Sequence, residues 1–399
     1  MTVERPRIDG LSSHPPLLRG GFRPFFLGGA LWAVIVLALW LGALAGTIPL
    51  PSAFEPLAWH RHEMLFGYLG AVIAGFLLTA IPNWTGRLPV TGPRLAALAG
   101  LWLAARLAVL FSAWVGPWTA LALDSGFLLT LAAAAAREVI AANTRHRPIV
   151  AVLALLACAN AIDHGEALGW RVSEGLGWRA GLAVVLMLIG LVGGRIIPSF
   201  TRNWLSKHGD TAALPSQPDR FDNGSLLALA AALVSWTAAP TAAVSAALLV
   251  VVGGLQAIRL GRWAGYRAWR DPLVLILHIG FAWLPLGLMM LGASILIPAI
   301  PRTLALHALT AGAMGTMTLA VMTRATLGHT GRALRADAAT IAIYGLVTLG
   351  AGARVIAPLL PLDYSSAIDA AGLLWGAAFL LFVITYGPKL VGPRPDGRA

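Results

Sequence analysis

Apolar segments of about the length of a membrane-spanning helix recur along the whole chain, and this feature limits the fold more than any other. A hydrocarbon core about 30 Å thick requires roughly 20 apolar residues in a helix, which satisfies its own backbone hydrogen bonds. Of the 399 residues, 58% are hydrophobic and only 12% are charged, whereas about 25% are charged in soluble proteins. The sequence therefore predicts an all-α, polytopic membrane protein.

We predict twelve membrane-spanning helices in one membrane domain over residues 1–399, with residues 1–24 and 388–399 as cytoplasmic tails. The seventh and eighth spans are short, rich in alanine and separated only by Ala239 and Pro240, so a single re-entrant pair is the alternative for them. The spans are expected at residues 25–46, 63–84, 95–113, 117–136, 149–166, 178–198, 224–239, 241–258, 272–293, 303–323, 338–360 and 367–387.

The distribution of basic residues predicts the orientation of these spans. One set of alternate loops holds 21 Lys and Arg residues, and the other set holds only four, Arg61, Arg171, Arg179 and Arg302. Because cytoplasmic loops collect Lys and Arg, both termini are expected on the cytoplasmic side. The formal net charge is +12. The charged residues flank the spans and form no basic stripe, so the expected partner is the lipid bilayer and not nucleic acid.

Two histidines at the start of the second span, His60 and His62 in the segment WHRHEMLF, are the first candidate ligands. A spacing of two places them on opposite faces of a regular helix, so they cannot both bind one metal ion from it. His307 lies about one turn inside the outer end of the tenth span, at a depth similar to that of His62. At a helical spacing of four, Gly70 and Ala74 lie below His62, and Ala311 and Gly315 lie below His307. These small residues favour either close helix packing or space for a flat macrocycle bound by the histidine.

A second polar group is expected toward the cytoplasmic face. His278 enters the ninth span about two turns from that face, Arg324 ends the tenth span, and His329 follows it. Ionisable groups inside a membrane indicate metal binding or proton transfer, although a hydrogen bond to a carbonyl also explains a buried histidine. Arg324 is expected either to reach the interface or to pair with an acidic group such as a haem propionate. Because about 30 Å of hydrocarbon separates the two faces, we predict a second site or proton route here.

Five blocks of the sequence resemble the NnrS family and together cover most of the chain. This resemblance implies a bacterial inner-membrane protein that contains haem and copper and takes part in the nitric oxide response and in protection against nitrosative stress. It implies nitric oxide or a related small molecule as ligand and an electron donor that it does not identify. The blocks are GFRPFFLGG (21–29), WHRHEMLFGY (59–68), AGFLLTAIPNWTGR (74–87), LHIGFAWLPLGL (277–288) and HALTAGAMGTMTLAVMTRATLGHTGR (307–332).

The predicted topology also resembles the catalytic subunit of haem-copper oxidases and nitric oxide reductases. In those enzymes, histidines near the outer ends of the second and tenth spans hold a low-spin haem. We therefore predict that His62 and His307 are the two axial ligands of one haem, with His60 replacing His62 if the helix starts late. The sixth and seventh spans, residues 178–198 and 224–239, lack the histidines of a second metal, so the sequence does not predict catalytic reduction of nitric oxide.

Two other functions fit the same residues. A proton-coupled transporter would use the intramembrane histidines as proton or substrate groups, and it would favour inverted repeats and broken helices, which the sequence does not indicate. A membrane sensor or assembly factor would need a partner-facing soluble region. The longest polar loop, residues 199–223, is too short for one.

Overall fold

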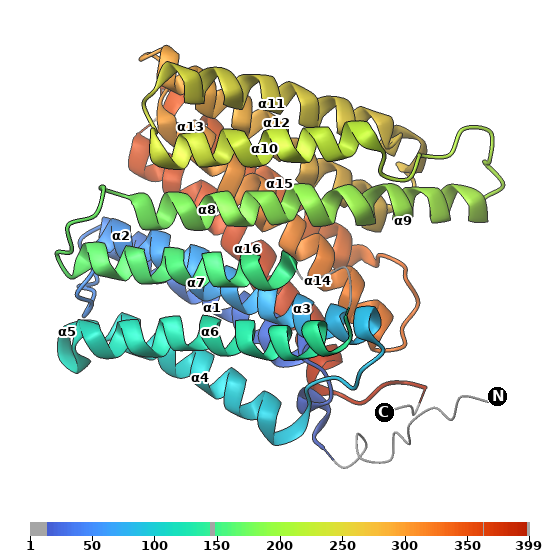
Figure 1. The fold of residues 1–399 in the computed structure, drawn as a ribbon, viewed down its shortest axis with the longest axis horizontal. Coiled ribbons are helices and arrows are strands. Elements are labelled where there is room, and N and C mark those ends of the chain that lie inside the picture. Colours follow the sequence, from blue (N-terminus) through green and yellow to red (C-terminus); the bar gives the residue numbers. More distant parts are fainter. Residues whose placement is uncertain (1–13, 144–147, 362, 397–399) are drawn as a thin grey trace. The chain divides into compact units, whose positions relative to one another are not determined.

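The computed structural model describes residues 14–143, 148–361 and 363–396, and within them every regular element is a helix (Figure 1). The α-helices are α1 (Phe22–Leu44), α2 (Pro56–His62), α3 (Leu69–Thr85), α4 (Gly92–Leu110), α5 (Ser112–Val115), α6 (Pro117–Ala141), α7 (Pro148–Ala167), α8 (Leu176–Leu188), α9 (Gly194–Lys207), α10 (Arg220–Ala238), α11 (Ala243–Arg262), α12 (Pro272–Leu296), α13 (Arg302–His307), α14 (Gly315–His329), α15 (Ala338–Ile356) and α16 (Tyr364–Val391). Three short 3₁₀ helices are η1 (Pro16–Leu18), η4 (Gly265–Ala268) and η6 (Ala357–Leu359).

Three long helices each contain a π-helical segment between two α-helical parts. These segments are η2 (Glu63–Tyr68), η3 (Ile189–Gly193) and η5 (Ala308–Met314). The η2 segment begins immediately after His62, and η5 begins immediately after His307. A π-helical turn widens the helix locally and often marks a functional site. Both principal candidate histidines therefore lie at a local change of helix geometry.

Eleven helical stretches in the described residues are long and apolar enough to cross a membrane, which confirms the all-α membrane fold. The remaining predicted span, the seventh, corresponds to α10, a helix of 19 residues whose first turn is polar and is capped by the side chain of Asp219. Its neighbour α11 is a separate helix of 20 residues that packs against it. Both helices are long enough to span a bilayer. Among the twelve predicted spans, α10 is the one that is not apolar enough to be supported by its composition.

Several predicted boundaries differ from the observed ones. The second membrane helix begins at Pro56, seven residues before the predicted start, because proline fits the first turn of a helix. As a result, His60 and His62 both lie on the helix. The sixth span continues to Lys207 because Pro198 lies inside α9 without ending it. The first helix begins at Phe22 and the last ends at Val391, so each overlaps a predicted tail, while residues 1–13 and 397–399 lie outside the described part of the chain.

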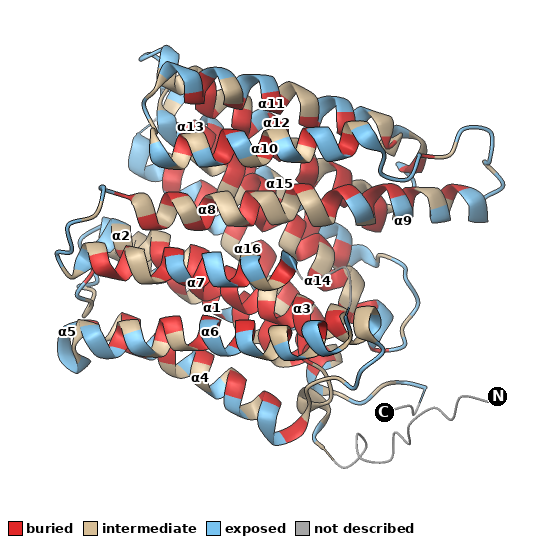
Figure 2. Cartoon of the chain, viewed as in Figure 1, coloured by how far each residue is buried: buried red, intermediate tan, exposed pale blue. Residues whose placement is uncertain are grey.

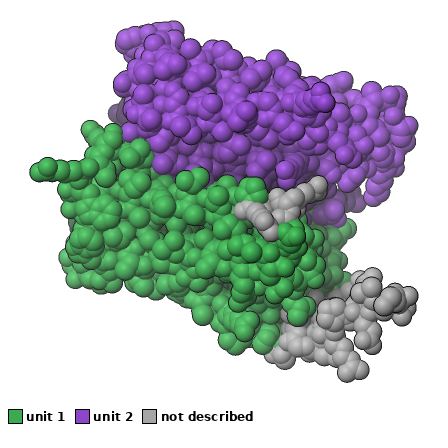
Figure 3. Space-filling view, in the orientation of Figure 1, with its two compact units in different colours: residues 1–178, 325–333, 383–399 green, residues 179–324, 334–382 purple. Residues whose placement is uncertain are grey.

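The chain divides into two compact units (Figure 3). Unit 1 comprises residues 1–178, 325–333 and 383–399, and unit 2 comprises residues 179–324 and 334–382. In unit 1, α1 packs on α3 and α6 packs on α4 and α7; in unit 2, α11 packs on α10 and α12. The prediction of one membrane domain over the full length stays a prediction.

Burial along the helices follows the pattern of a protein in lipid (Figure 2). Large apolar side chains are exposed at mid-helix, including Leu129 in α6 and Leu227 and Val234 in α10. In contrast, Asp124 on α6 is fully buried. Charged groups that face the interior of a membrane bundle are costly and require partners, which directs attention to the neighbours of Asp124.

Candidate functional site

Seven polar side chains meet in the interior of unit 1, and we call this set the buried polar network. They come from four parts of the unit: the junction of α2 and η2, and the helices α4, α6 and α7. All seven are at least 97% buried. The members are His62, Glu63, Arg106, Asp124, Asn160, Asp163 and His164.

His62 lies between two carboxylates. Its Nδ1 is 2.8 Å from Oδ2 of Asp163, and its Nε2 is 2.8 Å from Oδ2 of Asp124. A neutral imidazole donates from only one nitrogen, so two carboxylate partners require a proton shared among the three groups. The ring is therefore held in a fixed orientation, in a position where it can carry a proton or bind a cation.

Asp124 is the centre of the network. Its Oδ2 faces Nε2 of His62 and also Nε2 of His164, 3.1 Å away. The amide of Asn160 donates to the same oxygen at 2.7 Å, and Ser125 fixes that amide by donating to Asn160 Oδ1 at 2.8 Å. The two imidazoles and the carboxylate thus converge on one point, with their ligand atoms within 4.8 Å of one another.

An ion pair between Arg106 and Glu63 forms the other end of the network. Nη1 of Arg106 donates to both carboxylate oxygens of Glu63 at 2.8 Å, and Nη2 donates to Oδ1 of Asp124. The indole of Trp32 adds a hydrogen bond to Glu63 at 2.5 Å. A Cβ atom at Gly67 would collide with the Glu63, Arg106 and Trp32 side chains, so the absence of a side chain there allows the ion pair to form.

Aromatic rings cover the histidine side of the network. The ring of Phe54 lies 4.9 Å from that of His62 and 5.2 Å from that of His164, and Phe66 lies 5.1 Å from His62. The two histidine rings are 4.6 Å apart and nearly perpendicular. Apolar cover of this kind excludes water and strengthens the electrostatic interactions beneath it.

The other predicted outer histidines have different environments. In unit 2, Nδ1 of His307 donates to the carbonyl of Thr303 at 2.8 Å, which leaves the Nε2 lone pair of a neutral ring for another partner. Arg354 lies within electrostatic reach of this ring, and its buried Nη1 has no hydrogen-bond partner among the described residues. In unit 1, His60 stacks on Trp40 at 4.9 Å, so His60 and His62 contact different groups, as their spacing predicts.

The predicted inner residues separate into two environments. In unit 2, Nε2 of His278 lies 2.9 Å from the hydroxyl of Thr201, which itself donates to a carbonyl and therefore accepts from the ring. Arg324 lies over the ring of Phe200 at 3.9 Å, and its buried Nη1 has no hydrogen-bond partner in the described part of the chain. His329 belongs to unit 1, where its ring lies 5.5 Å from that of Phe22. The structure brings His278 and Arg324 against the same helix, α9.

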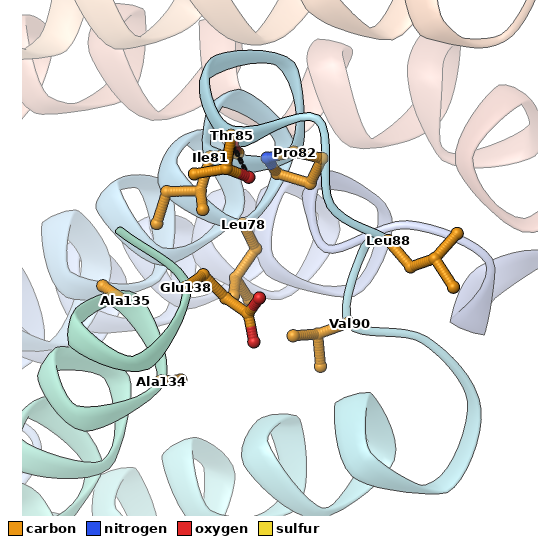
Figure 4. Close-up of a pocket in the computed structure, with 9 residues that line it drawn as sticks. All are labelled: Leu78, Ile81, Pro82, Thr85, Leu88, Val90, Ala134, Ala135 and Glu138. Carbon is orange, nitrogen blue, oxygen red and sulfur yellow. Dashed lines mark hydrogen bonds between the residues drawn. The ribbon is translucent and has the colours of Figure 1, made fainter. Parts of the chain in front are cut away.

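A small apolar pocket in unit 1 (Figure 4) has none of the candidate ligands in its lining. Its only charged lining residue, Glu138, forms ion pairs with Arg87 and Arg137. This arrangement provides no free ligand atom for a metal. The pocket is lined by Leu78, Ile81, Pro82, Thr85, Leu88, Val90, Ala134, Ala135 and Glu138.

Sequence reasoning found His62 but missed its partners. The predicted ligands include neither Asp124 and Asp163, which contact His62, nor Arg106 and His164, which contact Asp124. A usable signal was present, because Asp124 interrupts the apolar run ALALDSGFLLTLAAAA and Arg106 interrupts LWLAARLAVL. Charged residues within spans of an apolar protein are expected to pair.

Comparison with known proteins now gives the family. The family model of the NnrS protein matches residues 16–394, which is nearly the whole chain. No curated protein is similar enough to give a match. The match includes both units, the buried polar network and the candidate histidines of unit 2. The chain therefore belongs to the NnrS family.

Proposed function

We propose that this membrane protein binds haem and copper, takes part in the nitric oxide response and protects against nitrosative stress. Membership of the NnrS family supports this role, and eleven apolar helices support a location in the bilayer. We further propose that the membrane is the bacterial inner membrane, that both termini are cytoplasmic, and that an electron donor not yet identified serves the haem. The alternation of basic residues between loops supports this orientation.

The observation that carries the haem proposal is the oriented ring of His307 together with the unpartnered buried nitrogen of Arg354, both in unit 2. The hydrogen bond from Nδ1 to Thr303 orients the imidazole and presents Nε2, as second-shell bonds do for metal-binding histidines. The unpartnered guanidinium nitrogen of Arg354 is suited to a carboxylate such as a haem propionate. These residues fit the group, and the π-helical segment after His307 widens the helix next to it.

When bound, the haem supplies an iron that binds a diatomic ligand such as nitric oxide and exchanges an electron. The chain's own residues hold and orient it. His307 would hold the group through Nε2, Thr303 would fix the imidazole ring, and Arg354 would neutralise negative charge on the group. Arg324, whose guanidinium also has an unpartnered buried nitrogen, lies 17 residues further along, or about 25 Å in a helix. It is therefore better suited to a separate anionic group toward the other end of the helix.

The pairing of His62 with His307 on one haem stays a prediction. The two histidines belong to different units, and both nitrogens of His62 already face carboxylates. Binding iron would require His62 to release either Asp124 or Asp163. The arrangement around His62 fits a non-haem cation better than a haem.

The test is to purify the full-length protein and the His307→Ala, His62→Ala and His60→Ala variants and to measure haem by its pyridine haemochrome spectrum. We expect His307→Ala to lose the haem or to become high-spin, and the matched control His208→Ala to keep it. If His62→Ala also loses the low-spin spectrum while His60→Ala keeps it, the two-histidine clamp is supported. Full low-spin haem in His307→Ala would refute the assignment.

A proton-coupled transporter is the second candidate function, and one observation favours it. His62 lies between Asp124 and Asp163 and so forms a chain of groups able to hold and transfer a proton. A colourless, metal-free protein that moves a solute in proteoliposomes when a proton gradient is applied would support the transporter. Haem and copper in the purified protein, without such transport, would exclude it.

A further inference from the structure

We infer that His62, His164 and Asp124 bind a divalent first-row transition-metal ion in the interior of unit 1. The site itself is inferred from the geometry of the network, and its assignment to copper rests on the function proposed above. It differs from the haem proposal in its residues, in the kind of ligand and in the unit that contains it.

The donor atoms of the three residues converge on one point. Nε2 of His62 and Nε2 of His164 lie 2.8 Å and 3.1 Å from the same oxygen of Asp124. Ligand atoms bonded to a metal at about 2.0–2.2 Å lie roughly 2.9–3.6 Å from one another in ordinary coordination geometries. The two measured separations are close to this range. All three ligand atoms lie within 4.8 Å of one another, so they can face a common ion in place of each other once every pair moves into this range.

Residues around the three proposed ligands hold two of them in place. The other nitrogen of His62 faces Asp163 at 2.8 Å, which is the carboxylate–histidine arrangement that orients metal ligands. Asp124 is held in turn by Asn160 and Arg106, which donate to its two oxygens. His62 and Asp124 thus have partners that fix their orientation, and each keeps a lone pair that can bind a metal ion.

Charge also favours a cation. Glu63, Asp124 and Asp163 are buried carboxylates, and among the described residues Arg106 is the fully buried cation that forms ion pairs with Glu63 and Asp124. Without the proton that His62 shares with its two carboxylates, the network has a formal charge of two negative units, and such a charge inside a membrane protein is costly. Arg61 lies within electrostatic reach of Asp163 and also of two further carboxylates, so its charge is shared. A divalent cation that displaces the shared proton would neutralise the network.

The donor set limits the kind of ion. Two imidazole nitrogens and one carboxylate oxygen suit copper(II), iron(II) or zinc, whereas copper(I) prefers thiolate or thioether. The single cysteine, Cys158, is exposed and is not part of the network. The aromatic cover from Phe54 and Phe66 shields the site from water.

The opposing explanation is a hydrogen-bond network that only stabilises the fold. The deciding variant is His164→Gln, because the sole side-chain hydrogen bond of His164 among the described residues is the one to Asp124. The glutamine amide can replace this bond. We would strip the purified full-length protein with a chelator, titrate it with copper(II), and record metal content and electron paramagnetic resonance spectra. The wild-type protein, His164→Gln, Asp124→Asn and the remote control His208→Ala would be compared.

We expect one equivalent of copper(II) at this site in wild type and in His208→Ala, with hyperfine coupling from two imidazole nitrogens. His164→Gln should lose one nitrogen coupling and bind at least about tenfold more weakly, because removal of even an outer-shell group costs 10–100-fold. Asp124→Asn should lose the site. Equal binding and identical spectra in all four proteins, or no copper binding to wild type, would overturn the inference.

Haem is measured in the same samples, which separates this inference from the proposed function. A protein that binds copper(II) at this site but never contains haem would refute the haem proposal and leave the metal site standing. A protein that contains haem but binds copper(II) equally well in His164→Gln and Asp124→Asn would refute the metal site alone.

Discussion

Replacement of Arg106 by methionine should be the most destabilising single change in unit 1. The guanidinium donates two hydrogen bonds to Glu63 and one to Asp124, and its side chain is fully buried. Methionine has a similar length and fills most of the volume, so the main effect is the loss of charge. Asp124 keeps its contacts to Asn160, His62 and His164, whereas among the described residues Glu63 keeps only the hydrogen bond from the indole of Trp32.

The loss in the free energy of unfolding can be estimated from the uncompensated charge of Glu63. Removing one partner of a buried ion pair costs about 3–5 kcal/mol, because the other charge stays buried without compensation. At about 1.4 kcal/mol for each factor of ten, the ratio of folded to unfolded protein should fall by roughly two to three and a half orders of magnitude. Adding Glu63→Gln removes the uncompensated charge. The double variant should therefore be more stable than Arg106→Met alone, by about 1–3 kcal/mol.

The assay is reversible unfolding in mixed micelles with increasing dodecyl sulfate, followed by circular dichroism. Arg137→Met is the matched control, since its side chain is 60% exposed and its pairing with Glu138 is superficial. It should cost less than about 1 kcal/mol. The reasoning is refuted if Arg106→Met is as stable as the control, or if the double variant is no more stable than Arg106→Met.

Three further predictions test other parts of the structure. Gly67→Ala should lower the unfolding midpoint because the new methyl group collides with the buried ion pair, whereas Gly100→Ala in open space should not; equal midpoints would contradict this. Reporter fusions in the loop after α11 should read cytoplasmic and fusions near Arg171 should read external, and the reverse result at both points would overturn the orientation. His278→Ala should keep the haem absorbance and lower copper content or protection against nitric oxide, and complete loss of the haem band would show that both groups belong to one site.

The fold class and the family are readable from the sequence because both depend on local properties. Helix length and apolar composition decide whether a segment can cross a membrane, and α10 is the span for which that composition is weakest. Two prolines show that helix boundaries are harder to predict than the helices themselves. Pro56 starts a helix seven residues before the predicted start, and Pro198 lies within a helix that was expected to end there.

The composition of the site was decided by tertiary structure. The partners of His62 come from α6 and α7, and Asp163 lies 101 residues away in the chain. Hydropathy and spacing give the depth of each charged residue and the face of the helix it occupies. They do not say which helices become neighbours. Which helices become neighbours depends on the packing of many similar apolar surfaces. It also depends on the buried charges of Arg106, Asp124 and Glu63, because each would be costly to bury alone in a low-dielectric interior.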